Sequence, residues 1–293
     1  MGRKAGVPGS RGAGVPGKRP AGGSASRRAV VLLSGGMDSA TALAVAAKSG
    51  YEIHALSFDY GQRHGRELNS ARKIASHFDV REHLVLRIPL GDLGGSALTD
   101  KNIPVPEGKG PWRRGASIPP TYVPGRNLIF LSFAAAYAEI LGAEAVFIGA
   151  NALDYSGYPD CRSDFLRQLE KTVKKGTKRG AAGRPLKMIA PLLSLSKADI
   201  VRLGASLGVP FQLTWSCYRG GKRPCGRCDS CLIRSKGFVE AGIDDPLIAI
   251  GGRGGKGARV QGGKGKSSIR RRTLAPLHPM HPSTLSHIRR NRH

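Results

Sequence analysis

Short apolar runs alternate with longer amphipathic segments along most of this chain. Residues 29–33, AVVLL, form a continuous apolar run typical of a strand that is buried on both faces. Residues 40–50 are rich in alanine and end at Gly50, which predicts a helix, and the aromatic and aliphatic residues of 51–61 predict a second strand. Strand, loop, helix and strand in this order predict a parallel β-loop-α-β unit.

The same alternation continues toward the C-terminus. It predicts further helices at 67–80, 127–143, 162–175 and 195–208, and further strands at 81–88 and 145–150. At the start of the last helix, Ser196 and Asp199 have the spacing of a capping box. Residues 91–126 contain too much glycine and proline for regular elements, and long loops of this kind commonly carry site residues. The pattern predicts a doubly wound, mostly parallel α/β domain over residues 28–212.

Composition changes this picture at the two ends of the chain. The 293 residues include 47 Lys and Arg against 20 Asp and Glu, a formal charge of +27. The first 28 residues and residues 249–293 supply 18 of these positive charges without one acid. Segments rich in Gly, Pro, Ser and Arg bury too little apolar surface to offset their chain entropy. We therefore expect residues 1–27 and 249–293 to be disordered basic extensions, either solvated, as we favour, or in dispensable contact with RNA.

Neither a secretory signal nor a membrane span is expected from the sequence. The N-terminal segment has no apolar core of the kind that signal peptides carry. No run of 18 apolar residues occurs anywhere in the chain, whereas a helix that crosses a bilayer needs about 20. We therefore expect a cytoplasmic protein that does not enter membranes.

A glycine-rich turn, SGGMDS at residues 34–39, separates the first predicted strand from the first predicted helix. Such a turn collects free backbone N–H groups and the positive end of a helix at one place, which favours an anion. The sequence has neither the Gly-Lys-Ser/Thr ending of the Walker loop nor the G-x-G-x-x-G of dinucleotide sites at this turn. We interpret it as a phosphate loop rather than a tight turn with a capping serine.

Four of the five cysteines lie close together near the end of the predicted core. They follow the pattern C-x7-C-x2-C-x2-C and are Cys217, Cys225, Cys228 and Cys231. Two thiolates of a C-x2-C pair can face one ion, and four thiolates close a tetrahedron around Zn²⁺ without an open position. We predict one structural zinc ion per chain in a small module over residues 213–248; an iron–sulfur cluster and unligated cysteines are the alternatives. Cys161 stands alone and is either a packed apolar residue or a reactive thiol.

The loop SGGMDS resembles the SGGxDS signature of the PP-loop ATP pyrophosphatase superfamily, which has an adenine nucleotide alpha hydrolase-like fold. The resemblance implies that the loop binds the phosphates of ATP, that Asp38 helps to hold Mg²⁺, and that Asp38 and Ser39 are catalytic. The residues that it assigns to ATP binding are Leu33, Ser34, Gly35, Gly36, Met37, Asp38, Ser39, Ala40, Thr41, Ala42 and Leu43. Lys197, in the first turn of a later predicted helix, is a further candidate for a phosphate contact.

Four further motifs occur in order with this loop and the four cysteines: FDYGQRH (58–64), SALT (96–99), YVPGRN (122–127) and LDYSGYPDCR (153–162). Their combination resembles the 7-cyano-7-deazaguanine synthase family of the queuosine pathway over about residues 28–248. The resemblance implies conversion of 7-carboxy-7-deazaguanine and ammonia to the nitrile 7-cyano-7-deazaguanine, with ATP, through an activated carboxylate and an amide. No glutaminase motif is visible, so free ammonia is the expected nitrogen donor, and many members of the superfamily are homodimers.

The same motifs supply side chains that suit a purine-like base with a carboxylate. The candidates for substrate binding are Phe58, Tyr60, Gln62, Arg126, Asn127, Asp154, Tyr155, Tyr158, Asp160 and Arg162. Asp59, Arg63 and His64 share the first motif and end the second predicted strand, where open α/β sheets place ligands. Two other functions remain open: a PP-loop thiolase or ligase that modifies tRNA, and a zinc-stabilised nucleic-acid-binding protein.

Overall fold

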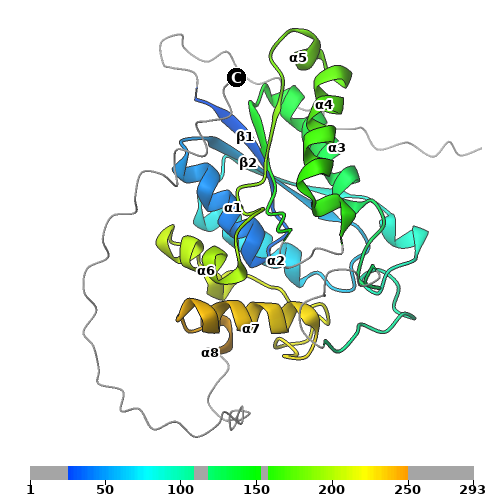
Figure 1. The fold of residues 1–293 in the computed structure, drawn as a ribbon, viewed down its shortest axis with the longest axis vertical. Coiled ribbons are helices and arrows are strands. Elements are labelled where there is room, and N and C mark those ends of the chain that lie inside the picture. Colours follow the sequence, from blue (N-terminus) through cyan, green and yellow to red (C-terminus); the bar gives the residue numbers. More distant parts are fainter. Residues whose placement is uncertain (1–25, 109–117, 153–157, 250–293) are drawn as a thin grey trace, which may run out of the picture. The chain divides into compact units, whose positions relative to one another are not determined.

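The computed structural model describes residues 26–108, 118–152 and 158–249 (Figure 1). All of them lie in the first of two units into which the chain divides, Met1–Gly252. The predicted extensions fall outside the described residues apart from residues 26, 27 and 249, and the candidates Asp154 and Tyr155 also fall outside them. No helix within the described part of the chain is long and apolar enough to span a bilayer.

The core is a parallel five-stranded sheet in the order β3-β2-β1-β4-β5. Its strands are β1 (Arg28–Leu32), β2 (Glu52–Asp59), β3 (Glu82–Arg87), β4 (Ala145–Phe147) and β5 (Lys187–Ile189). The chain leaves β1 toward one edge through β2 and β3, and later returns to the other side of β1 through β4 and β5. The order therefore reverses at β1, and this confirms the predicted doubly wound fold. Open α/β sheets bind ligands at the carboxyl ends of the strands that flank such a reversal.

Helices cover both faces of the sheet. The structure forms α1 (Met37–Lys48), α2 (Arg66–His77), α3 (Arg126–Leu141), α4 (Ser163–Gly176), α5 (Lys178–Ala181), α6 (Lys197–Ser206), α7 (Asp229–Ala241) and α8 (Pro246–Ala249). Short 3-10 turns lie at Leu90–Leu93, Pro159–Cys161 and Phe211–Leu213. The predicted cap of α6 is confirmed, because Ser196 Oγ accepts from the backbone N–H of Asp199 at 3.2 Å.

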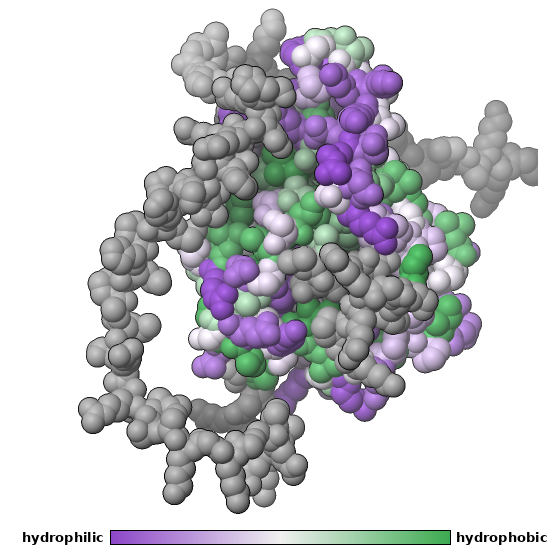
Figure 2. Space-filling view, viewed as in Figure 1, coloured by the Kyte–Doolittle hydropathy of each residue, from purple (hydrophilic) through white to green (hydrophobic). Residues whose placement is uncertain are grey.

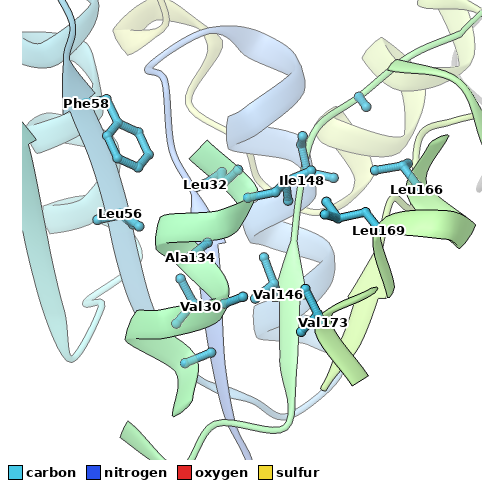
Figure 3. Close-up of a cluster of buried hydrophobic side chains, with 14 of the residues drawn as sticks. Val30, Leu32, Leu56, Phe58, Ala134, Val146, Ile148, Leu166, Leu169 and Val173 are labelled. Atoms are coloured by element: carbon cyan, nitrogen blue, oxygen red, sulfur yellow. The ribbon is translucent and has the colours of Figure 1, made fainter. Parts of the chain in front are cut away.

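Successive side chains of β1 point to opposite faces and enter two separate apolar clusters. Val30 and Leu32 pack with α3 and α4, as the close-up in Figure 3 shows. Ala29 and Val31 pack on the other face, in a cluster that includes residues of α1, α2 and α7. Both faces are covered, which is why the strand reads as a continuous apolar run rather than an alternating one.

The observed elements differ from the predicted ones in two respects that bear on the site. The first helix begins at Met37 rather than at residue 40, so that Asp38 and Ser39 lie in its first turn. The strand β5 has no counterpart among the predicted elements, because a three-residue strand at the sheet edge is too short to show a period. The strand forms through pairing with β4, in which Val146 faces Met188.

Candidate functional site

The turn between β1 and α1 can be built only with a glycine at its second position. Gly35 has a φ of +88°, a region that glycine enters without steric cost. A Cβ atom at Gly35 would lie 2.1 Å from the carbonyl oxygen of Glu67 and 2.8 Å from the backbone nitrogen of Ala71. The turn therefore packs directly on the first turns of α2.

Hydroxyl groups hold the rest of this turn in place. Ser39 Oγ lies 3.0 Å from Ser34 Oγ, accepts from the Ser34 N–H at 3.2 Å and donates to the Gly36 carbonyl at 3.0 Å. The turn therefore leads directly into the first turn of α1, where N–H groups lack intrahelical partners and the helix end carries partial positive charge. This is the arrangement that binds phosphate in proteins.

A buried ion pair connects the turn to α6. Lys197 Nζ donates to both carboxylate oxygens of Asp38 at 2.9 Å, although the two residues are 159 positions apart in the sequence. The Lys197 side chain is only 6% exposed. Gly237 of α7 makes room for it, because a Cβ there would lie 2.3 Å from Lys197 Cγ. Three elements thus place one cation and one carboxylate beside the phosphate loop.

A cavity of about 220 Å³ opens at the carboxyl ends of β1, β2 and β4, where the strand order reverses. From the predicted ATP loop, its wall includes Leu33, Ser34, Gly36, Met37, Asp38 and Ser39. From the predicted substrate residues, it includes Phe58, Tyr60, Gln62, Arg126, Asn127 and Tyr158, and Lys197 lines it as well. The loop and most of the described substrate candidates therefore share one space.

The remaining candidates lie behind or outside this wall. Ala40, Thr41, Ala42 and Leu43 are buried in α1 behind the loop. Asp160 is buried and accepts from the backbone N–H of Asn127 at 2.9 Å, so it positions the start of α3. The side chain of Arg162 is exposed, and this residue is not part of the cavity wall.

Arg126 lines the cavity together with Phe58, Tyr60 and Tyr158. Burial opposes its charge, but the nearby phenol, thiol and carboxyl groups of Tyr60, Tyr158, Cys161 and Asp160 raise the pKa of Arg126. Burial, together with the charge of Glu67, raises the pKa of Tyr60 to about 12, and Arg126 opposes that shift. At neutral pH the cavity therefore contains a guanidinium beside neutral phenols, which suits an anionic group on a flat aromatic ligand.

Glu67, Trp215 and Tyr218 also line the cavity, and the sequence analysis did not identify them. Burial raises the pKa of Glu67 to about 7, while the charge of Arg126 acts in the opposite direction. Glu67 lies three residues beyond the FDYGQRH motif in an ordinary amphipathic helix. No local signal marks it, because only the packing of α2 on Gly35 brings it to the site.

Other residues of the FDYGQRH motif hold the surroundings of the cavity together. Gln62 accepts from the Tyr60 N–H at 2.8 Å and donates to the Phe58 carbonyl at 3.3 Å. Arg63 donates to the carbonyl groups of Ala97, Asp100 and Ile103, and so fixes the SALT segment.

Two more members of this motif face away from the ligand space. His64 Nε2 lies 3.0 Å from the carbonyl oxygen of Cys217, and burial lowers the pKa of His64. Asp59 lies 3.7 Å from Arg87 of β3. Both residues therefore have structural partners, and neither lines the cavity.

The four clustered cysteines form a candidate metal centre beside the cavity. Their sulfur atoms all lie within 4.8 Å of one another, and in a tetrahedral zinc–thiolate site they would be separated by about 3.8 Å. Backbone N–H groups of Arg219 and Cys225 point to Cys217 Sγ at 3.4 and 3.3 Å. Donors of this kind stabilise thiolates, so the residues fit a closed metal site.

The cysteine cluster is connected to the turn between β1 and α1 through one residue. The backbone N–H of Trp215 donates to the Gly35 carbonyl at 2.9 Å, and its indole Nε1 donates to the Cys217 carbonyl at 2.9 Å. Trp215 is buried in the same cluster as three of the cysteines. Trp215 therefore bonds both to the turn before α1 and to the backbone of the cysteine cluster.

Cys161 does not belong to this centre. It is buried, and burial raises the pKa of its thiol to about 12. Its sulfur accepts from Asn127 Nδ2 at 3.2 Å. A thiol with such a pKa is protonated at neutral pH, so the residue acts as a packed side chain.

The sequence model of the family described as Queuosine biosynthesis protein QueC matches residues 28–242. The chain is 56% identical over 221 residues to a 7-cyano-7-deazaguanine synthase of Acetivibrio thermocellus, covering 75% of this chain and 97% of that relative. It is 57% identical over 226 residues to a 7-cyano-7-deazaguanine synthase of Anaeromyxobacter dehalogenans, covering 76% and 96%.

Among solved structures, the NMN synthetase of Francisella tularensis aligns with a TM-score of 0.40 and 17% identity, over 78% of this chain and 82% of that chain. A similarity of this size carries no argument about activity. The family match, in contrast, includes the phosphate loop, the cavity and the four cysteines.

Proposed function

The chain belongs to the QueC family of queuosine biosynthesis proteins, and on this premise we propose that it is a 7-cyano-7-deazaguanine synthase. It uses ATP to convert 7-carboxy-7-deazaguanine and ammonia into 7-cyano-7-deazaguanine. The observation that carries the proposal is that one cavity is lined both by the phosphate loop and by an aromatic wall with a guanidinium. Such a cavity can hold a nucleotide next to a flat, carboxylate-bearing base.

ATP binds with its phosphates against the turn between β1 and α1. The N–H groups of this turn and the N-terminus of α1 stabilise the phosphate charge, and Ser34 and Ser39 add hydroxyl donors. Lys197 supports them with a cation that is already placed in the cavity wall. Asp38 would hold Mg²⁺ bound with ATP, and this ion would neutralise charge on the phosphates.

The deazaguanine lies against the aromatic side of the cavity. Phe58 and Phe130 form a stacked pair with ring centroids 4.0 Å apart, and Tyr60 meets Phe130 edge to face at 5.5 Å. These rings offer a flat apolar surface for a bicyclic base. Arg126 pairs with the carboxylate of the base and turns it toward the loop.

The chemistry requires two activations of the same carbon. A carboxylate is a poor electrophile, so one of its oxygens first attacks a phosphorus atom of ATP, the P–O bond to the departing part of ATP breaks, and the carboxylate oxygen becomes part of a leaving group. Ammonia then attacks the acyl carbon and loses a proton, the activated oxygen leaves with its phosphoryl group, and the amide forms. The amide oxygen is activated in the same way, and its departure with loss of both N–H protons leaves the nitrile. The loop stabilises the negative charge that develops on phosphate at each activation.

The four cysteines would hold one structural Zn²⁺, which would fix Trp215 and through it the Gly35 carbonyl. We also propose that the protein is a homodimer, because α3 exposes apolar side chains at Leu128, Phe133 and Ile140. The reaction takes place in the cytoplasm, where thiols stay reduced and available to metal. Contact of the terminal extensions with RNA is not required for it.

A tRNA thiolase is disfavoured by the cysteines. Enzymes of that kind use a catalytic cysteine pair outside the metal site, and Cys161 alone remains here, with a pKa near 12. A nucleic-acid-binding protein without catalysis would have no need for the ordered phosphate loop.

The test is turnover of the purified full chain with 7-carboxy-7-deazaguanine, ATP, Mg²⁺ and ¹⁵N-ammonium, followed by mass spectrometry. We expect the acid to become a singly labelled amide and then a singly labelled nitrile. Failure of a folded, zinc-replete sample to form amide or nitrile would refute the proposal.

Two matched variants sharpen this test. Asp38→Asn should abolish both products, because it removes the carboxylate beside the loop. Asp92→Asn makes the same chemical change at an exposed residue that does not line the cavity, and it should leave turnover unchanged.

A further inference from the structure

One segment of the described core is strongly basic: residues 162–187, which run through α4 and α5 to β5. It holds nine Lys and Arg and two acids, a formal charge of +7. Residues 29–248 have 29 basic and 20 acidic residues, or +9. Most of the net charge outside the extensions is therefore concentrated in 26 residues. We call this segment the basic ridge.

The fold presents these charges to solvent. Leu166, Leu169 and Val173 bury one face of α4 against the sheet. The opposite face then carries exposed cations, among them Lys171, Lys174 and Lys175, and Lys178 continues the row into α5. Figure 2 shows hydrophilic residues in a band over these helices.

Acidic side chains that contact the ridge accept from backbone N–H groups: Glu139 accepts from the N–H of Arg179 at 2.8 Å. Glu170 accepts from the backbone N–H of Met188 at 2.7 Å and so faces β5. Within the described ranges no ion pair joins a Lys or Arg side chain of α4 or α5 to a carboxylate. A solvent-exposed helix face without a binding role usually carries basic and acidic side chains in alternation.

The length and spacing of the ridge fit an extended polyanion better than a small one. The 14 residues of α4 extend about 21 Å, and cations four residues apart are separated by about 6 Å along the axis. A nucleotide needs a few donors at one point, as the phosphate loop provides. None of the lysines or arginines in the basic ridge lines the cavity, so this surface is separate from the proposed ATP site.

We propose that the basic ridge docks the phosphate backbone of folded RNA. Large exposed apolar or aromatic side chains occur elsewhere in the described part of the chain but not on α4 or α5, so the surface offers no stacking platform for unpaired bases. It matches the regularly spaced phosphates of a duplex stem, which proteins contact without reading sequence.

The test measures affinity of the full chain for a labelled RNA stem-loop by fluorescence anisotropy across a salt series. The ridge variant combines Lys171→Gln, Lys174→Gln, Lys175→Gln and Lys178→Gln. Each lost phosphate contact reduces the slope of log K against log salt by about 0.9. We therefore expect the slope to fall by up to about 3.6 for the four lost contacts, with at least a tenfold loss of affinity.

A control variant removes four exposed positive charges elsewhere, through Lys48→Gln, Lys73→Gln, Arg81→Gln and Lys101→Gln. It should keep the parental slope and affinity within twofold. Thermal unfolding of both variants confirms that they fold, and nitrile formation in the same samples should be unchanged.

Three results would overturn the inference. The ridge variant could bind RNA as the parent does, or the control could lose as much as the ridge variant. Alternatively, the ridge variant could bind vesicles rich in phosphatidylglycerol more weakly than the parent does, while its affinity for RNA is unchanged. That result would identify a membrane surface as the partner. Because turnover is measured separately, failure of RNA binding and failure of the proposed reaction are distinct outcomes.

Discussion

Substitution of Gly35 by alanine tests whether the phosphate loop depends on close packing against α2. At a φ of +88° any other residue is strained, at a cost of about 1–2 kcal/mol. The new Cβ would also lie 2.1 Å from the Glu67 carbonyl oxygen, and forced overpacking of this kind costs about 1–3 kcal/mol more. We expect Gly35→Ala to lower the free energy of unfolding by about 2–5 kcal/mol.

Gly50 provides a matched control because it has a similar φ of +78° but nothing within 4 Å of its added Cβ. Gly50→Ala therefore carries the backbone strain alone, about 1–2 kcal/mol. Urea denaturation of both variants and the parent gives the three free energies of unfolding. Equal losses in the two variants would show that contact with α2 contributes nothing and would refute the argument from packing.

Three further predictions concern the buried charges and the metal centre. Asp245→Ala leaves the guanidinium of Arg234 buried without the carboxylate that it meets at 2.7 and 2.9 Å, so denaturation should show a loss of about 3–5 kcal/mol. Asp244→Ala, at the exposed neighbour, should cost less than about 0.5 kcal/mol. Removal of metal by a chelator should raise the KM for ATP, measured by initial rates, because Trp215 connects the centre to the loop; an unchanged KM would contradict that connection. Burial raises the pKa of Glu67 from 4.5 to about 7, so the folded state holds the proton more tightly and stability should fall as pH rises from about 4.5 to 7. Glu67→Gln should flatten this decline in denaturation curves measured across that range, and an unaltered decline would exclude Glu67 as its source.

Contacts between distant parts of the chain explain why the sequence analysis was incomplete. Lys197 was predicted as a candidate for a phosphate contact from its place in the first turn of a helix, but its pairing with Asp38 depends on how α6 packs against α1. Glu67 has no motif of its own, and Trp215 reaches Gly35 through a backbone hydrogen bond that any residue type could make. Contacts between residues that are far apart in the chain produce neither a hydrophobic period nor a motif of fixed spacing in a single sequence.

Local patterns were sufficient for the fold class, the glycine-rich turn before α1 and the clustering of the four cysteines. Each depends on neighbours in the chain: a buried strand needs a continuous apolar run, a phosphate-binding turn needs glycines, and a metal module needs cysteines at short spacing. Tertiary structure alone decided which candidates face the cavity, placing Tyr60 and Arg126 in its wall and leaving Arg162 exposed. The physical reason is that burial and electrostatic environment arise only when separate helices and strands pack on one sheet.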